Sequence, residues 1–271
     1  MDDIDRFLSE DLGTDGDITS DALFTNEVAE ACIWAKQRCV VAGLKEAATV
    51  FTRTGAETTS LVLDGDFVEE NTVVMNINGS IRSILKGERL ALNFLGRMSG
   101  IATETKKLVE QCRGVNPKVQ IASTRKTTPG FRKYEKKAVV LGGGEPHRYG
   151  LYDAVLIKDN HLRGVSSVKE AVQRIKRKIH NKIIEVEVEN EHDALVVAQI
   201  AVDVIMLDNF DAENGMNVAE KIRKINPDIL IEVSGGITPE NILSYASFAD
   251  RISLGYLTHS IQNKDFSLEM K

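Results

Sequence analysis

The sequence predicts an α/β protein in which an N-terminal α+β part precedes an incomplete α/β barrel. After Pro117, short runs of β-branched and apolar residues alternate with helical patterns, which is typical of βαβ units and a parallel sheet. Six such runs are clear, fewer than the eight strands of a closed barrel. We therefore expect an open barrel, with an open doubly wound sheet as the alternative.

The segment before Pro117 has the pattern of a small antiparallel sheet with a helix packed on one face. Asp17 can cap a helix, and Gly55 can end one. Gly96, Ser99 and Gly100 are small residues within a long helical stripe, so another element can approach that helix closely. The expected elements are a short helix and a capped turn within 1–20, strand material in 30–43, a helix over 44–55, alternating strands in 60–79 and a long helix over 86–112.

The barrel part alternates regularly. Its predicted strands cover 119–124, 154–158, 182–189, 203–208, 229–234 and 251–255, and its predicted helices cover 131–141, 167–179, 191–201, 212–225 and 239–249. Sites of parallel α/β folds lie at the carboxyl ends of the strands. The polar, charged or glycine residues at the expected ends are Arg125, Lys126, Lys158, Asp159, Asn160, Asp208, Asn209, Ser234, Gly235, Gly236 and Gly255.

The third predicted strand of the barrel carries alternating glutamates. Glu185, Glu187 and Glu189 share one face because side chains alternate along a strand. Helices cover the outer face of a barrel, so we expect these carboxylates inside, where each needs a cation or a metal. Lys126, Lys158 and a divalent ion are the candidates, and an edge strand with a solvated face is the alternative.

A basic stretch from 123 to 161 stands out in a chain that is otherwise acidic. Arg125 and Arg148 can make bidentate contacts with carboxylate or phosphate. Three glycines at 142–144 bring backbone close to a ligand, and His147 can be an acid, a donor or a structural residue. We interpret the basic residues of the intervening helix as a solvated face; they are Arg132, Lys133, Lys136 and Lys137.

Glycines at two later strand ends indicate a phosphate site. Gly235 and Gly236 leave backbone N–H groups unshielded and precede a helix expected to begin near Pro239. Gly255 ends the next strand, so two consecutive strand ends carry glycine at the position where α/β barrels usually bind phosphate.

The overall composition limits the class of protein. With 34 Lys+Arg against 40 Asp+Glu and a net charge of -6, a general nucleic-acid binder is disfavoured. There is no apolar run long enough to span a bilayer and no evident signal peptide, so cytoplasm is the default location. The three cysteines have no CxxC spacing, which disfavours a zinc site or a disulfide framework.

A set of motifs along the chain resembles one enzyme family. STRKTTPG, GGGEPHRYGL, LIKDNH, EVEVEN, MLDNF, SGGIT and GYLTHS occur in the order and spacing of quinolinate phosphoribosyltransferases, and EDLGTDGDITS and GERLALNFLGRMSGIAT are also similar. The resemblance implies an N-terminal α/β sandwich over 1–112, an incomplete seven-stranded barrel over 113–256, and a tail over 257–271 that packs back on the first domain. It also implies a homodimer with a shared active site, with a hexamer as the alternative.

The resemblance assigns roles to individual residues. It implies a quinolinate site lined by Arg125, Lys126, His147, Arg148 and Lys158, with Arg89 reaching in from the partner chain. It implies that the ribose hydroxyls and Mg²⁺ of phosphoribosyl pyrophosphate are held by Glu187 and Asp208, and that its 5′-phosphate is held by Ser234, Gly235, Gly236 and Gly255. The catalytic residues expected among them are Lys126, Lys158, Glu187 and Asp208.

The family's activity joins quinolinate to phosphoribosyl pyrophosphate with loss of CO₂, giving nicotinate mononucleotide for NAD biosynthesis. Two alternatives remain open. Glu145–Pro146 before the His-Arg pair is similar to a molybdenum-associated paralogue, although LIKDNH favours the quinolinate enzyme. A non-catalytic barrel that binds a phosphorylated metabolite is the other, but it leaves Glu187 and Asp208 without a role.

Overall fold

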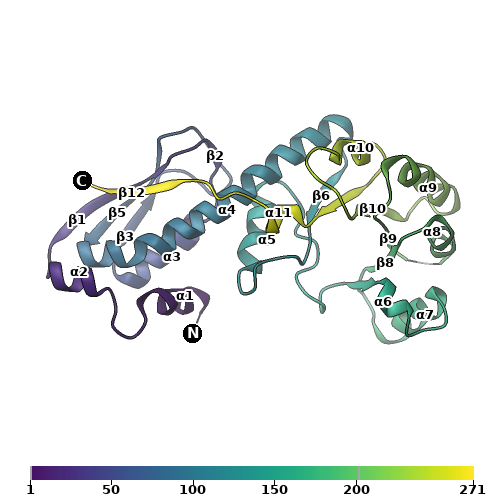
Figure 1. Ribbon diagram of the computed structural model, residues 1–271, viewed down its shortest axis with the longest axis horizontal. Helices are drawn as coiled ribbons and strands as arrows, with labels where there is room; N and C mark the ends of the chain where they lie inside the picture. Colours follow the sequence, from purple (N-terminus) through teal and green to yellow (C-terminus); the bar gives the residue numbers. More distant parts are fainter. Residues whose placement is uncertain (1, 201) are drawn as a thin grey trace. The chain divides into compact units, whose positions relative to one another are not determined.

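The computed structural model describes residues 2–200 and 202–271, and the chain divides into two compact units (Figure 1). The first unit contains the chain up to Lys106 together with 140–143 and 261–271. The second contains 107–139 and 144–260. The last residues of the chain thus belong to the first unit, because β12 (Phe266–Met270) pairs antiparallel with β1 (Val28–Ala35).

The first unit is built on a four-stranded antiparallel sheet in the order β12-β1-β5-β3, with a separate two-stranded pair. Its other strands are β2 (Cys39–Val40), β3 (Glu57–Ser60), β4 (Phe67–Val68) and β5 (Thr72–Ser80), and its helices are α1 (Asp3–Leu12), α2 (Ile18–Leu23), α3 (Leu44–Thr54) and the start of α4 (Ile81–Val115). The predicted cap is confirmed, because the Asp17 side chain accepts the Ser20 amide at the start of α2. Gly55 ends α3 with φ 94°, as predicted.

One face of this sheet forms the core of the first unit. Ala31 lies opposite Ile77, and Ile33 lies opposite Met75; all four are buried. The other face is more polar, where the Cys32 thiol donates to the Asn76 side chain. This alternation has the two-residue period that the sequence shows.

The small residues of α4 accept close packing, as predicted. A Cβ on Gly100 would lie 2.4 Å from the carbonyl oxygen of Gln262, and one on Gly96 would lie 2.8 Å from that of Lys264. The Ser99 hydroxyl donates to Ala42 O and accepts the Ala42 amide at 2.9 Å. The tail therefore runs along α4 at a separation that larger side chains would prevent.

The second unit contains a parallel sheet in which six strands of the described chain follow the order β6-β11-β10-β9-β8-β7. These are β6 (Gln120–Ser123), β7 (Val155–Ile157), β8 (Ile184–Val188), β9 (Val204–Asp208), β10 (Leu230–Ser234) and β11 (Arg251–Leu254). From β7 onward each strand pairs with the next one in the chain, and β11 returns to β6. A doubly wound sheet would instead reverse its strand order at a switch point. The fold is thus a barrel left open between β6 and β7.

The opening carries only a remnant of a further strand. Glu145 forms an isolated parallel bridge with Ala122 of β6, and its amide donates to Ile121 O at 2.7 Å. Within 2–200 and 202–271 the seventh strand implied by the resemblance is therefore a single bridged residue. This bridge fixes where the following Pro146–Arg148 segment enters the opening.

The predicted helices of the second unit are present as α5 (Arg132–Leu141), α7 (Val168–Lys178), α8 (Glu191–Ala198), α9 (Ala212–Ile225) and α10 (Ile242–Ala246), the last shorter than predicted. Two short helices were not predicted, α6 (Asp159–Leu162) and α11 (Tyr256–His259). In Figure 1, α8 and α9 lie on the outer side of β8 and β9. The end of the helix predicted over 191–201 falls on residue 201, outside the described residues. None of the described helices has the length and apolar character needed to cross a membrane.

Candidate active site

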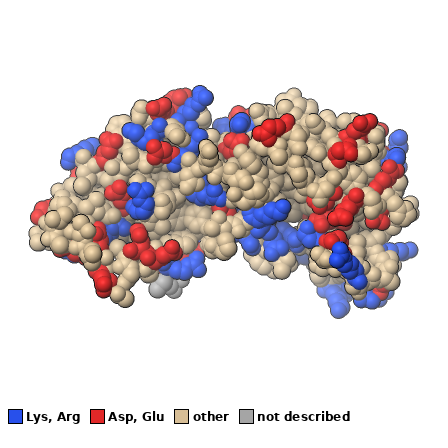
Figure 2. All heavy atoms as spheres, viewed as in Figure 1, with Lys and Arg blue, Asp and Glu red and all other residues tan. Residues whose placement is uncertain are grey.

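A pocket of about 640 Å³ lies within the second unit at the carboxyl ends of the strands. Every site residue predicted from the sequence lines it, except Arg89: Arg125, Lys126, His147, Arg148, Lys158, Glu187, Asp208, Ser234, Gly235, Gly236 and Gly255. Figure 2 shows Lys and Arg side chains gathered near the end of β6, on a surface where acidic side chains are otherwise frequent. The barrel thus brings together residues that are up to 130 positions apart, because parallel strands end at one rim.

The strand order decides how the pocket is divided. β6 and β7 flank the opening, so Arg125 and Lys126 after β6 lie across it from Lys158 after β7, with Arg148 in the segment that fills it. Gly235 and Gly255 follow β10 and β11, on the side of β6 away from the opening. The carboxylates at the ends of β8 and β9 complete the rim. One side of the pocket is therefore cationic, and another offers glycine backbone.

Arg89 is placed on α4 of the first unit, where its side chain is exposed. It is not among the residues that line the pocket of its own chain.

The glutamate side chains within β8 are buried, as the alternation predicts. Glu187 is 9% exposed and forms an ion pair with the Lys158 ammonium. Glu185 is 2% exposed and faces His147, whereas Glu189 is exposed after the strand end. The prediction that these carboxylates meet cations inside the barrel is confirmed for the two that lie within β8.

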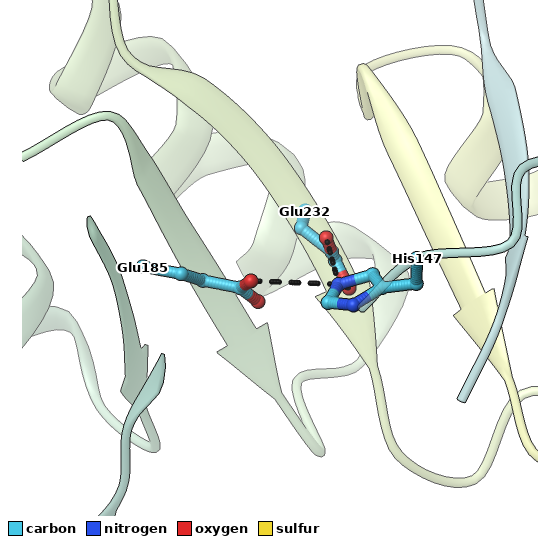
Figure 3. A group of neighbouring side chains, drawn as sticks. All are labelled: His147, Glu185 and Glu232. Atoms are coloured by element: carbon cyan, nitrogen blue, oxygen red, sulfur yellow. Dashed lines mark hydrogen bonds and ion pairs between the residues drawn. The ribbon is translucent and has the colours of Figure 1, made fainter. Parts of the chain in front are cut away.

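Glu185 belongs to a buried cluster with His147 and Glu232 (Figure 3), and Arg251 pairs with Glu232; we call these four residues the histidine cluster. Nε2 of His147 lies 3.4 Å from Oε2 of Glu185 and 3.3 Å from Glu232. Nη1 of Arg251 lies 3.1 Å from Oε2 of Glu232, which is fully buried. Three strands thus hold one histidine from inside the barrel.

The histidine cluster retains a proton. Burial alone would lower the pKa of His147, but hydrogen bonds to Glu185 and Glu232 outweigh it and raise this pKa to about 9. Burial and the neighbouring Glu232 carboxylate raise the pKa of Glu185. Nδ1 of His147 accepts the Arg148 amide at 2.8 Å, which leaves Nε2 to carry the ring proton toward the two glutamates.

The backbone at His147 is unusual for its residue type. Its φ is 51°, in the left-handed region that non-glycine residues seldom adopt. Such a conformation persists only where the surroundings impose it. Here the ring is held at both nitrogens, by the Arg148 amide on one side and the two glutamates on the other. The imidazole nitrogens are thus used within the protein, and His147 fixes the position of Arg148.

The basic side chains of α5 are less exposed than the sequence predicted. Lys136 is fully buried, and Arg132 is half-buried, with its guanidinium bonded to Thr127 Oγ1 at 3.0 Å and Tyr149 O at 2.9 Å. Only Lys133 of these four is fully on the exposed surface. The interpretation was wrong for Lys136. A helical pattern does not show that buried polar groups on other segments can bind a lysine side chain.

Two glycines shape the side of the pocket expected to take phosphate. Gly235 and Gly236 have φ of 83° and 61°, which favour glycine. The following helix begins at Ile242 rather than near Pro239, because residues 236–241 form a turn in which the Asn241 side chain accepts the Thr238 amide at 2.8 Å. The backbone N–H groups on this side of the pocket therefore belong to a turn rather than to a helix N-terminus.

Substituting Gly235 is expected to disrupt this turn. A Cβ would lie 2.3 Å from Oδ1 of Asn209, and φ is positive, so Gly235→Ala requires a backbone shift at the pocket. We expect binding of a phosphate-bearing ligand to weaken at least 10-fold, about 1.4 kcal/mol. Isothermal titration with ribose 5-phosphate measures this. The matched control is Gly114→Ala, where a Cβ would meet nothing within 4 Å; equal loss in both variants would contradict the expectation.

Glu187 and Asp208 can hold a magnesium ion together with a substrate. They end the adjacent strands β8 and β9, and both line the pocket. Mg²⁺ typically takes one or two carboxylates and completes its sphere with water and substrate phosphates. In the described chain, the group of three His or acidic residues close enough for an ion is instead His147, Glu185 and Glu232. Within that group His147 contacts both glutamates, and Glu232 also pairs with Arg251.

Several residues of the site were missed in the sequence. Glu232 stands two positions before Ser234, in the same alternation that drew attention to Glu185 and Glu187, so the signal was present. His259 lies one helical turn after Gly255, close enough that a Cβ there would be 2.9 Å from its Nε2. Arg251 at the start of a strand and Lys136 on a helix carry no local signal.

Comparisons with known proteins match nearly the whole chain. The model of the quinolinate phosphoribosyl transferase N-terminal domain matches residues 17–99, and that of the C-terminal domain matches 101–269. A probable nicotinate-nucleotide pyrophosphorylase [carboxylating] of Archaeoglobus fulgidus is 45% identical over 258 residues, covering 94% of this chain and 98% of that protein. The human nicotinate-nucleotide pyrophosphorylase [carboxylating] is 35% identical, covering 89% and 82%.

Solved structures agree with the sequence matches. The nicotinate-nucleotide pyrophosphorylase of Ehrlichia chaffeensis superposes with a TM-score of 0.92 at 35% identity, covering 99% of this chain and 97% of that one. That of Francisella tularensis has the same TM-score and identity and covers 99% and 94%. The matches extend over both units of the fold, and the chain belongs to the quinolinate phosphoribosyl transferase family.

Proposed function

We propose that this protein is a decarboxylating quinolinate phosphoribosyltransferase, which converts quinolinate and phosphoribosyl pyrophosphate to nicotinate mononucleotide, pyrophosphate and CO₂ in NAD biosynthesis. The observation that carries the proposal is the division of one pocket into a cationic side and a glycine-lined side with two carboxylates on the rim. A dicarboxylate and a phosphorylated sugar with adjacent hydroxyls need this set of groups. The names of the relatives support the same activity.

The cationic side suits the aromatic acid. Arg125 and Arg148 offer planar guanidinium groups for carboxylates, and Lys158 adds a point charge at the end of β7. Arg148 is half-buried, and its pKa is lowered by burial and by the nearby Arg125. Two guanidiniums brought this close favour an anionic ligand, because binding it relieves their mutual repulsion.

The carboxylates on the rim suit the sugar. Ribose hydroxyls can donate to Glu187 and Asp208, and the 5′-phosphate can take the N–H groups around Gly235, Gly236 and Gly255, with the Ser234 hydroxyl beside them. The anomeric carbon then lies between these groups and the cationic side. Glu187 is positioned to stabilise the positive charge that develops on the ribose as pyrophosphate departs.

The chemistry follows from this arrangement. The quinolinate nitrogen attacks the anomeric carbon, and Lys126 and Lys158 offset the charge of the leaving pyrophosphate. Mg²⁺ bound at Glu187 and Asp208 would supply further neutralisation of the diphosphate. The ring nitrogen becomes cationic, so it can stabilise the carbanion left when the adjacent carboxylate departs as CO₂, and this carbanion then takes a proton from water. No protein nucleophile is required.

The assay uses purified protein with quinolinate, phosphoribosyl pyrophosphate and Mg²⁺. We expect equal amounts of nicotinate mononucleotide and CO₂, and much less product with nicotinate in place of quinolinate. Absence of product would refute the proposed function. Binding of either substrate by calorimetry without turnover would instead indicate the non-catalytic barrel.

The proposal includes a homodimer in the cytoplasm in which Arg89 completes the partner's pocket. What supports it is that Arg89 is exposed and lies in the segment GERLALNFLGRMSGIAT, which resembles the family. Arg89→Ala and Glu187→Ala proteins, each inactive alone, should regain activity after their subunits are exchanged, because a hybrid dimer has one intact site. Continued inactivity of the mixture, with exchange shown by mass spectrometry, would contradict a shared site.

A further inference from the structure

Lys136 of α5 is a fully buried lysine behind the cationic side of the pocket. Its ammonium donates to the carbonyl oxygen of Pro146 and lies 3.3 Å from the Ser123 hydroxyl. The Ser123 hydroxyl in turn donates to Pro146 O at 2.9 Å. Three polar groups from a helix, a strand and a loop therefore meet at one buried point.

This point connects two parts of the proposed acid site. Ser123 is the last residue of β6, two positions before Arg125. Pro146 comes two positions before Arg148 and directly before His147, whose φ of 51° needs support from its surroundings. Lys136 thus ties the strand end that carries one arginine to the loop that carries the other.

We infer that Lys136 is a positioning residue for the acid-binding arginines: by holding the Pro146 carbonyl and the Ser123 hydroxyl together, its ammonium sets the spacing of Arg125 and Arg148 around a bound dicarboxylate. The inference rests on the proposed function, since it concerns the acid of that same pocket. It assigns no contact between Lys136 and the substrate, because Lys136 is fully buried and does not line the pocket.

The charges around Lys136 support this role. Burial, together with Arg132, Arg125 and Arg148, lowers its pKa to about 8, while Asp153 acts in the opposite sense. The Tyr149 ring lies 5.5 Å from its ammonium. A cation kept beside three arginines is electrostatically costly in the free protein. An anionic ligand between Arg125 and Arg148 offsets that repulsion and favours the charged form of Lys136.

The test compares Lys136→Met with Lys137→Met, a change of the neighbouring lysine on the same helix. We expect Lys136→Met to raise KM for quinolinate 10- to 100-fold and to leave KM for phosphoribosyl pyrophosphate within 2-fold. Lys137→Met should leave both within 2-fold. Phthalate, an unreactive aromatic 1,2-dicarboxylate, gives the same comparison by calorimetry without turnover, so a failure of the proposed activity would not hide the result.

A pH profile separates positioning from a merely structural role. In the wild type, phthalate affinity should fall as pH rises through about 8, where Lys136 loses its proton. In Lys136→Met the fall near pH 8 should be absent, which leaves the change near pH 9 that His147 contributes through Arg148, and in Lys136→Arg affinity should stay high at pH 8. An unchanged pH profile in Lys136→Met would overturn the inference.

Ser123→Ala covers the case in which Lys136→Met does not fold. It removes the hydroxyl of the same triad and introduces no unpaired charge. We expect a 3- to 10-fold loss of phthalate affinity with the circular dichroism spectrum unchanged. Wild-type affinity for phthalate in this variant would contradict the link between the two arginines.

Discussion

Replacing Glu232 with alanine is expected to lower the free energy of unfolding by about 3 to 5 kcal/mol. Glu232 is fully buried and is the carboxylate that both His147 and Arg251 face. Without it, a guanidinium and a proton-bearing histidine remain in the barrel with one carboxylate between them. Urea denaturation followed by circular dichroism measures the loss. Glu220→Ala on α9, an exposed position, should change stability by no more than about 0.5 kcal/mol.

The double variant Glu232→Leu with Arg251→Met distinguishes a charge effect from a packing effect. Removing both partners leaves no uncompensated guanidinium, and buried ion pairs replaced by apolar groups are often neutral in stability. We therefore expect the double variant to be more stable than Glu232→Ala. If it is equally destabilised, the interaction between the two side chains is not the source of the loss.

The histidine cluster also makes stability depend on pH. The pKa of His147 is about 9 in the folded protein and 6.5 in an unfolded chain. The contribution of this shift to the free energy of unfolding is therefore complete below pH 6.5 and is lost as pH rises toward 9. The wild type should lose up to about 1.4 kcal/mol per pH unit in this window. Lys136 acts in the opposite sense above pH 8 because its pKa is lowered. We therefore compare the free energy of unfolding as a function of pH in the wild type and in Glu232→Gln. The slope should be shallower in Glu232→Gln.

Replacing Lys158 with alanine is expected to lower kcat/KM for the proposed reaction by about 10² to 10³. Lys158 pairs with Glu187 at the opening of the barrel, so one change removes a cation from the acid side and leaves Glu187 without that partner. Initial rates of nicotinate mononucleotide formation measure the effect. Lys158→Arg keeps the charge and should retain more activity than Lys158→Ala.

The control for Lys158 is Lys169→Ala on α7, where the side chain is exposed and away from the pocket. It should keep wild-type kinetics. A Lys158→Ala protein with native circular dichroism and a rate within 3-fold of wild type would remove Lys158 from the catalytic residues. Loss of rate with both lysines would point to a general effect of surface charge.

Much of the fold could be predicted because its signals are local. The helix predicted over 212–225 has the same bounds in the structure, and the strand predicted over 203–208 begins one residue later. Each depends on the period of its own apolar residues and on its own capping group, such as Asp211, whose side chain accepts the Asn214 amide. The pairing of β11 with β6, which decides between a barrel and a doubly wound sheet, joins residues far apart and has no such local signal.

The candidate site divides in the same way. Alternation along one strand was sufficient to place Glu185 and Glu187 inside the barrel, and glycines at strand ends indicated the side of the pocket where we expect phosphate. The partners of these groups were less accessible to prediction. His147 contacts Glu232, which lies 85 positions later in the sequence. Lys136 of α5 donates to the carbonyl oxygen of Pro146 in the loop that follows.

The sequence by itself determined the α/β class, most element ranges, the polar strand ends and the family, because each of these depends only on local periodicity or on the order of motifs. The tertiary structure alone decided which cation each buried carboxylate meets, that Lys136 points inward, and that the barrel opens beside the arginines. The physical reason is that burial of a charge depends on every group around it. Those groups come together only once β6, β8, β10 and β11 share one rim.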